Sequence, residues 1–110
     1  MYKLALNYYR IDHKVFNLDD KTECFFMVCD GNGMVNSGIH DKDLLLFKLT
    51  DNPAIGSIVA AEVDGQVMCR RYIKNGSDII LRRENNQSPD IVLKRCKFKG
   101  ELVSLIRNFG

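Results

Sequence analysis

Short apolar runs separated by polar turns recur along most of the chain, with the length and residue types of β-strands. Residues 23–29 (ECFFMVC) and 43–49 (DLLLFKL) are apolar and rich in residues that favour extended backbone. The loop TDNPAIG, whose Pro and Gly mark a turn, precedes a third run at 57–63 (SIVAAEV). These three runs therefore predict three strands.

Two dipeptides, Asp64-Gly65 and Asn75-Gly76, each separate two β-like runs. Such pairs favour tight two-residue turns between antiparallel strands, because the turn needs positive φ angles that Asn, Asp and Gly tolerate. The pattern thus predicts consecutive hairpins. The remaining predicted strands are 66–74 (QVMCRRYIK), 77–83 (SDIILRR), 91–94 (IVLK) and 98–109 (FKGELVSLIRNF).

Strands at this spacing, with very little helix, predict a mostly β, barrel-like fold. A chain of 110 residues is long enough for one domain and too short for two. The stretch 2–10 (YKLALNYYR) fits either a helix or an edge strand. We therefore expect an N-terminal segment of uncertain structure over residues 1–14 and one domain over residues 15–110.

The composition, 45% hydrophobic and 27% charged, is typical of a globular chain. No run approaches the roughly 18 apolar residues of a membrane span, and early charges argue against a secretory signal. We expect no membrane association, no metal, no cofactor and a cytoplasmic location. The cysteines form no C-x-x-C pair and stand at no zinc-finger spacing from a histidine, which favours free thiols over a disulfide or zinc site. They are Cys24, Cys29, Cys69 and Cys96.

Charge is distributed unevenly. Residues 1–65 hold six Lys and Arg against ten Asp and Glu, a net charge of −4, whereas residues 66–110 hold ten against four, a net charge of +6. Three basic pairs, Arg70-Arg71, Arg82-Arg83 and Lys94-Arg95, could form a nucleic-acid face. No aromatic residues interleave with them, so we do not expect this domain alone to bind nucleic acid, and a basic nucleic-acid-associated module remains an alternative.

Six phrases, in matching order and spacing, resemble the C-terminal peptidase domain of the LexA/UmuD family. That family has a Gly-x-Ser-Met turn, an Asp-Gly-Asp-Leu-Leu strand start, a Gly-Asp-Ile-Val-x-Ala strand, a Val-Lys-Arg hairpin strand, a Pro-Glu-Asn loop and a closing Gly-x-Val-x-x-x-Ile-Arg strand. The resemblance covers about residues 15–110 and implies a LexA-like (signal-peptidase-like) β-barrel or β-ribbon domain. The phrases here are GNGM (31–34), DKDLL (41–45), GSIVAA (56–61), VMCRR (67–71), REN (83–85) and GELVSLIR (100–107).

The resemblance also implies a Ser–Lys dyad at two positions that this chain fills differently. In the family, the turn serine attacks a peptide carbonyl, a neutral lysine on the hairpin strand takes its proton, and turn N–H groups hold the oxyanion. The serine position is Gly33, the lysine position is Arg70, and the turn and oxyanion region is Asn32, Gly33 and Met34. Glycine cannot attack, and a guanidinium stays protonated. We therefore expect no active catalytic residue.

Other side chains could be imagined in the dyad's place. Ser37 lies four residues after Gly33, but no lysine stands at a matching position. Cys69 neighbours Arg70 on one predicted strand and should face the other way. Cys29 is expected to be a buried strand residue and His40 a solvated loop residue.

A different alternative is an active Ser–Lys self-cleaving peptidase in which Gly33 was introduced to block cleavage. Arg70 argues against this alternative, since one replacement is enough to stop the reaction.

In the resembled family the domain also dimerises, largely through its C-terminal strand, and its cleft takes an extended peptide as an added strand. Strict alternation places Leu102, Ser104, Ile106 and Asn108 on one face of this strand and Val103, Leu105, Arg107 and Phe109 on the other. These faces are either ordinary core and surface or a self-association edge. The dimerisation candidates are Leu102, Val103, Leu105 and Ile106.

The resemblance thus implies a homodimer, or a peptide or protein partner bound as an added strand. The leading hypothesis is a non-catalytic LexA-like module in transcriptional or stress-response (SOS) regulation.

Overall fold

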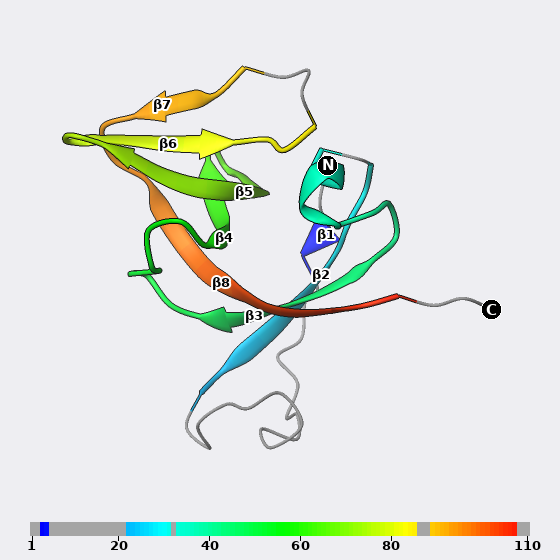
Figure 1. Ribbon diagram of the computed structural model, residues 1–110. Helices are drawn as coiled ribbons and strands as arrows, with labels where there is room; N and C mark the ends of the chain where they lie inside the picture. The colour runs from blue at the N-terminus through cyan, green and yellow to red at the C-terminus, as the bar shows by residue number, and fades with distance from the viewer. Residues whose placement is uncertain (1–2, 5–21, 32, 86–88, 108–110) are drawn as a thin grey trace.

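The computed structural model describes residues 3–4, 22–31, 33–85 and 89–107. In these residues eight strands form one antiparallel sheet, ordered β1-β2-β3-β8-β4-β5-β6-β7 (Figure 1). The single helical turn among them is the 3-10 turn η1 (Val35–Ser37). The mostly β prediction is confirmed. The strands are β1 (Lys3–Leu4), β2 (Cys24–Val28), β3 (Leu44–Leu49), β4 (Ile58–Val63), β5 (Gln66–Asn75), β6 (Asp78–Arg82), β7 (Ile91–Leu93) and β8 (Lys97–Ile106).

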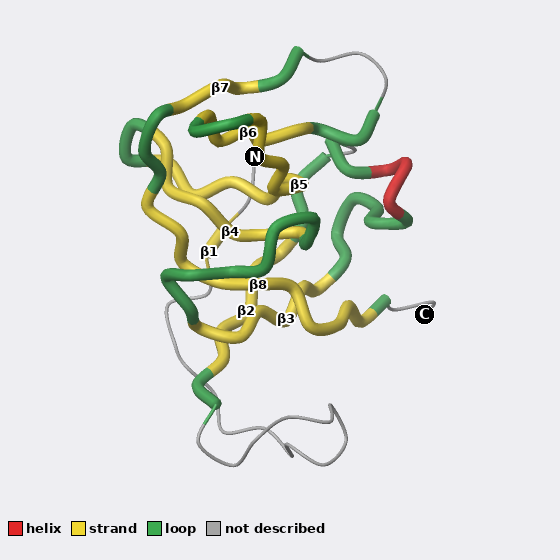
Figure 2. Tube along the Cα trace, turned by 60° about the vertical axis from the view of Figure 1, so that its left-hand side comes forward, coloured by secondary structure: helices red, strands yellow, loops and turns green. Residues whose placement is uncertain are grey.

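β8 joins the two halves of the sheet. Its residues 97–101 pair with β4, and its residues 100–106 pair with β3. Strands β1 to β3 lie on one side of β8 and strands β4 to β7 on the other, so the sheet curls about this long strand (Figures 1 and 2).

The two predicted hairpin turns are present. Asp64 and Gly65 both have positive φ, 52° and 79°, as a two-residue turn of this kind requires. The second turn lies one residue later than predicted, because Asn75 still pairs with Asp78 and the φ of Gly76 is 61°. The tolerance of glycine for positive φ therefore favours a turn in this region, whereas strand pairing determines which residues occupy the turn.

Both faces of the curled sheet bury apolar side chains. On β5, Cys69 packs in one cluster and Tyr72 in another, as alternating side-chain direction requires. We call these clusters the first and second cores. The first contains Phe25, Met27, Cys29, Met34, Ile39, Leu45, Phe47, Ala60 and Cys69, and the second contains Val59, Ala61, Tyr72 and Leu81.

β8 breaks the strict alternation that the sequence predicted. Leu46 of β3 pairs with Ser104, whereas its neighbour Phe47 pairs with Leu102, so Val103 is the extra residue of a β-bulge. Leu102 and Leu105 consequently both pack against the first core. The prediction that they lie on opposite faces was wrong, because the alternation of apolar and polar residues in the sequence does not show where a β-bulge forms. Asn108 and Phe109 lie outside the described residues.

At the N-terminus, β1 pairs Lys3 with Val28 and Leu4 with Met27, which favours the edge-strand alternative at these two positions. Residues 5–21 lie outside the described part, so the boundary between residues 1–14 and 15–110 stays a prediction. Within the described residues, no helix has the length and apolar character needed to cross a bilayer.

Gly100 lies on β8, where the two halves of the sheet meet, and it has no room for a side chain. A Cβ at this position would stand 2.7 Å from Cε1 of Phe25 and 2.8 Å from the Lys48 carbonyl oxygen. Phe25 cannot move freely, because its ring stacks on Phe47 with centroids 5.4 Å apart. Close packing of backbone and ring therefore requires glycine here.

We expect Gly100→Ala to lower the free energy of unfolding, measured by urea denaturation, by about 1–3 kcal/mol through overpacking. Gly33→Ala is the matched control, because the nearest atom to its Cβ would be Arg83 Nε at 3.6 Å. The control should change stability by less than about 0.5 kcal/mol. Equal losses in the two variants would contradict the packing argument.

Candidate functional site

The loop that carries Gly33 connects β2 to β3 and is closed at its base by hydrogen bonds. The Cys29 N–H donates to the Asp43 carbonyl at 2.8 Å, and the Lys42 N–H donates to the Cys29 carbonyl at 2.7 Å. Higher in the loop, the Gly31 N–H donates to Oδ1 of Asp41 at 2.7 Å. Backbone and carboxylate contacts therefore shape this loop.

Asp43 anchors the loop to the end of β8. Its side chain is only 1% exposed and receives two hydrogen bonds from Arg107, from Nε to Oδ1 at 2.8 Å and from Nη2 to Oδ2 at 2.7 Å. The His40 N–H donates to Oδ2 at 2.8 Å, and Nη2 of Arg107 also donates to the Gly38 carbonyl at 2.8 Å. The Arg107 hydrogen bonds hold the pKa of the Asp43 carboxyl below its ordinary value, despite burial.

Glu84 joins the same loop to the β5–β6 hairpin. Its carbonyl accepts the Asn36 N–H at 2.7 Å, and its Oε1 accepts the Ser37 hydroxyl at 2.7 Å and Arg71 Nε–H at 2.6 Å. Partial burial would raise the pKa of the Glu84 carboxyl, but the bonds from Ser37 and Arg71 outweigh burial and lower it. Ser37 therefore donates to a weak base, and this contact links two segments of the fold.

Gly33 does not occupy a backbone conformation that demands glycine. Gly31 and Gly38, on either side of it, have φ of 103° and 84°, but the φ of Gly33 lies outside that left-handed region. The three nearest neighbours of a Cβ at position 33 would all be Arg83 atoms, at 3.6 to 3.9 Å, which is ordinary contact. A Cβ would therefore fit at position 33 without displacing its neighbours.

Arg70 lies on β5 and is only 5% exposed. It pairs with Val59 of β4, and its Nη1 donates to the Cys69 carbonyl at 2.7 Å. Cys69 belongs to the first core together with Met34, so Arg70 and Cys69 face opposite sides of the sheet, as expected. The Ser–Lys dyad of the resembled family implies that Arg70 faces Gly33, and this stays a prediction.

Sequence reasoning missed two residues near the loop, Arg83 and Glu84. Both stand in the REN phrase at 83–85, which resembles the family's Pro-Glu-Asn loop, so the phrase marked the segment without assigning its contacts. Asn32, a predicted turn residue, lies outside the described residues. Met34 is fully buried in the first core.

The cysteines and His40 were the remaining side chains of interest. None of the four cysteines forms a disulfide, and burial raises the pKa of the Cys24 and Cys96 thiols, which keeps them protonated. Cys29 is fully buried, and its Sγ lies 3.3 Å from the Gly31 carbonyl. His40 is exposed, as expected. Across the described residues, no group of three or more His, Cys, Asp or Glu side chains could hold a metal ion.

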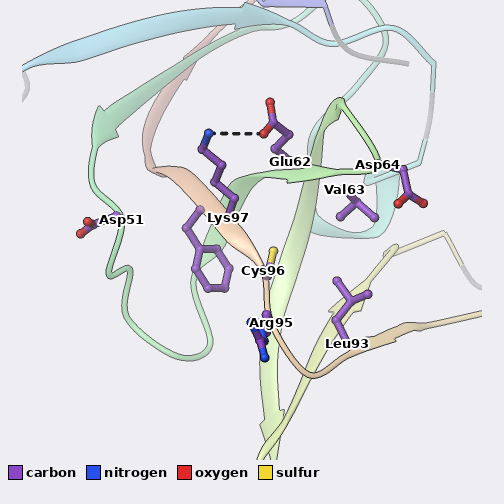
Figure 3. Close-up of a pocket in the computed structure, with 9 residues that line it drawn as sticks. Asp51, Glu62, Val63, Asp64, Leu93, Arg95, Cys96 and Lys97 are labelled. Carbon is purple, nitrogen blue, oxygen red and sulfur yellow. Dashed lines mark ion pairs between the residues drawn. The ribbon is translucent and has the colours of Figure 1, made fainter.

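A cavity of about 520 Å³ lies elsewhere, between the β4–β5 turn and the β7–β8 connection (Figure 3). Lys97 and Glu62 form an ion pair at 3.7 Å beside it. It contains none of the predicted site residues. Its lining is Asp51, Glu62, Val63, Asp64, Leu93, Arg95, Cys96, Lys97 and Phe98.

The Asp43–Arg107 pair makes stability depend on pH. Because the folded-state pKa of Asp43 is lowered, its contribution is present above the unfolded pKa of about 3.9 and is lost as the pH falls through the folded value. We expect Asp43→Asn to cost roughly 1.5–3 kcal/mol of unfolding free energy at neutral pH, since a hydrogen bond to a charged group is lost. Urea denaturation should show the deficit shrinking below about pH 4.

Asp51→Asn is the matched control, because Asp51 is exposed and forms no ion pair with any residue that the structure describes. A deficit that stays constant down to pH 2 would contradict the role of the Asp43 charge.

The sequence of this chain is similar to that of one family of known proteins. A profile of the family described as Peptidase S24-like matches residues 3–103. The LexA repressor of Clostridium botulinum (strain Langeland) is 34% identical over 87 residues, which is 79% of this chain and 43% of that protein. The LexA repressor of Clostridium kluyveri is 32% identical over 92 residues, which is 84% of this chain and 46% of that protein. The chain thus spans less than half the length of these curated relatives. It belongs to the peptidase S24-like family and contains a LexA/UmuD-type domain.

Proposed function

We propose that this domain is a catalytically degenerate member of its family that acts by binding. It self-associates, or takes a peptide or protein partner as an added strand, in transcriptional or stress-response regulation in the cytoplasm. The observation that carries this proposal is Gly33, which stands at the serine position although its backbone does not require glycine. The buried Arg70 at the lysine position supports the same conclusion.

The chemistry of these two positions argues against peptide hydrolysis. Position 33 has no atom that could attack a carbonyl, and a guanidinium cannot accept the proton that a lysine amine would take. Loss of the nucleophile alone can cost on the order of 10⁶ in rate in a serine peptidase. Ser37 is no substitute, because the pKa of its partner Glu84 is lowered and a general base works best with a pKa near the working pH.

The regulatory part of the proposal rests on relatives that are named LexA repressors. Their names concern whole proteins more than twice as long as the matched region. For this chain, a place in transcriptional control and in the SOS response is therefore an inference from family membership.

The C-terminal part of β8 supports self-association. The pairing of β8 with β4 ends at Glu101, and beyond it Leu102 to Ile106 pair with β3 on one side. Ile106 is 46% exposed and lies on the face opposite the first core, next to Leu44 of β3. Among the described residues this part of β8 has no partner strand on its other side, and such an edge with an exposed apolar residue suits pairing with a second copy of the chain.

We expect the purified protein to remain intact at raised pH and to take no label from a fluorophosphonate probe, because it lacks a nucleophile–base pair. Gly33→Ser alone should do little, whereas Gly33→Ser with Arg70→Lys should recover slow hydrolysis of an added peptide. Gly33→Ala with Arg70→Lys is the matched control, since it restores the base position without a nucleophile. Self-cleavage of the unmodified chain, mapped by mass spectrometry, would contradict the proposal. Fluorophosphonate labelling that is present in the unmodified chain and lost in Ser37→Ala would place the nucleophile at Ser37.

Self-association predicts a dimer in sedimentation experiments. Ile106→Asp should raise its dissociation constant at least about tenfold, because a charge would enter the contact between strands. Ile55→Asp is the control, since Ile55 is 62% exposed in the loop before β4. A monomeric wild-type protein, or equal effects of both variants, would rule out β8 as the interface.

A further inference from the structure

The cavity between the β4–β5 turn and the β7–β8 connection is an open end of the second core (Figure 3). We call it the second-core cavity. Four of the residues that line it pack against the second core, and each of them is only half-buried, so apolar surface stays open to solvent there. They are Val63, Leu93, Cys96 and Phe98.

These apolar walls are held in place and carry no charge. The Phe98 ring packs against Tyr72 with ring centroids 4.7 Å apart, and strand pairing sets Phe98 opposite Ala61. Burial raises the pKa of the Cys96 thiol, which therefore stays protonated and neutral. The volume of about 520 Å³ lies within the range of small-molecule sites, roughly 300–1,000 Å³. The cavity thus offers a preformed apolar surface to a small ligand.

Charged side chains of both signs line the same cavity. Glu62 lies near two lysines, with Lys97 Nζ at 3.7 Å and Lys99 Nζ at 3.9 Å. The remaining charged lining residues, all exposed, are Asp51, Asp64 and Arg95. None of these three forms an ion pair or a side-chain hydrogen bond with any residue that the structure describes. Their charges are therefore available to a ligand.

The three available charges lie on different sides of the cavity (Figure 3). Asp51 belongs to the loop after β3, Asp64 to the β4–β5 turn and Arg95 to the β7–β8 connection. A ligand seated on the apolar walls therefore has carboxylates on two sides and a guanidinium on a third.

The balance of charge around the cavity favours a ligand that is neutral overall. The three carboxylates of the lining are balanced by Arg95, Lys97 and the adjacent Lys99. A nucleic-acid backbone would be repelled by the carboxylates. A ligand with one charge is attracted by one sign and repelled by the other, whereas a ligand that carries both charges is attracted by both.

We propose that the second-core cavity binds a zwitterionic α-amino acid with a large apolar side chain. That side chain lies on the walls formed by Val63, Leu93 and Phe98. The α-carboxylate pairs with Arg95, whose guanidinium fork matches its two oxygens, and the α-ammonium pairs with the carboxylates of Asp51 and Asp64. This site goes beyond the proposed function, because its lining includes neither the Gly33 loop nor the edge of β8 at residues 102–106.

The test is an NMR titration of the isotope-labelled chain with L-phenylalanine, following the methyl signals of Val63 and Leu93 and the Nε–H signal of Arg95. We expect a dissociation constant of about 1–5 mM, as the size of the ligand allows.

Analogues with the same aromatic body separate the contributions of the two charges. The compound 2-phenylethylamine keeps only the ammonium and 3-phenylpropionate keeps only the carboxylate, and each should bind about two- to fivefold more weakly than phenylalanine. The neutral 3-phenylpropanamide should bind more weakly than phenylalanine as well. Glycine, which has both charges but no apolar side chain, should leave the methyl signals in place.

Variants of the exposed charges assign each contact without disturbing the core. Arg95→Gln should weaken phenylalanine binding about two- to fivefold and should not weaken binding of 2-phenylethylamine. Asp51→Asn combined with Asp64→Asn should weaken binding of phenylalanine and 2-phenylethylamine, but not of 3-phenylpropionate. Lys74→Gln is the control, because Lys74 is an exposed cation of β5 outside the lining.

Four results would overturn the inference. They are the absence of shifts at several times the expected dissociation constant, binding of 3-phenylpropanamide as tight as that of phenylalanine, equal effects of Arg95→Gln and Lys74→Gln, and stronger shifts of the same signals with a DNA duplex. The proposed function is tested at other residues, and it fails separately through self-cleavage or fluorophosphonate labelling.

Discussion

The ion pair between the buried Asp43 and the partly exposed Arg107 is the contact on which the arrangement of the site depends. It joins residues 64 positions apart and holds a carboxylate that is only 1% exposed. A buried carboxylate is stable only when its oxygens are hydrogen-bonded, and here the guanidinium fork and the His40 N–H meet that need. Because Arg107 also bonds to the Gly38 carbonyl, the end of β8 and the loop that carries Gly33 form one unit.

Glu84 holds the loop from the other side. Its bonds to Asn36, Ser37 and Arg71 tie the loop to the β5–β6 hairpin, so the loop spans the two halves of the curled sheet. These bonds are made by backbone groups and by side chains other than those at positions 33 and 70. The contacts that shape this loop therefore do not depend on the side chains at positions 33 and 70.

The charge beside Gly33 is a permanent one. A neutral lysine beside a serine suits proton transfer, whereas the guanidinium of Arg83, whose Nε lies 3.6 Å from the position of a Cβ at Gly33, stays protonated. Glu84, which bonds to this loop, has a lowered pKa and is therefore a weaker base than an ordinary carboxylate.

Strand positions, hairpin turns and family membership could all be predicted from the sequence, because they depend on local alternation, on the φ preferences of Gly, Asn and Asp, and on the order of short phrases. The same phrases located Gly33 and Arg70. The bulge at Val103, the Asp43–Arg107 pair, the Glu84 contacts and the approach of Arg83 to Gly33 required the tertiary structure. Each depends on the register between strands distant in sequence, and a shift of one residue would send every side chain concerned to the opposite face of the sheet.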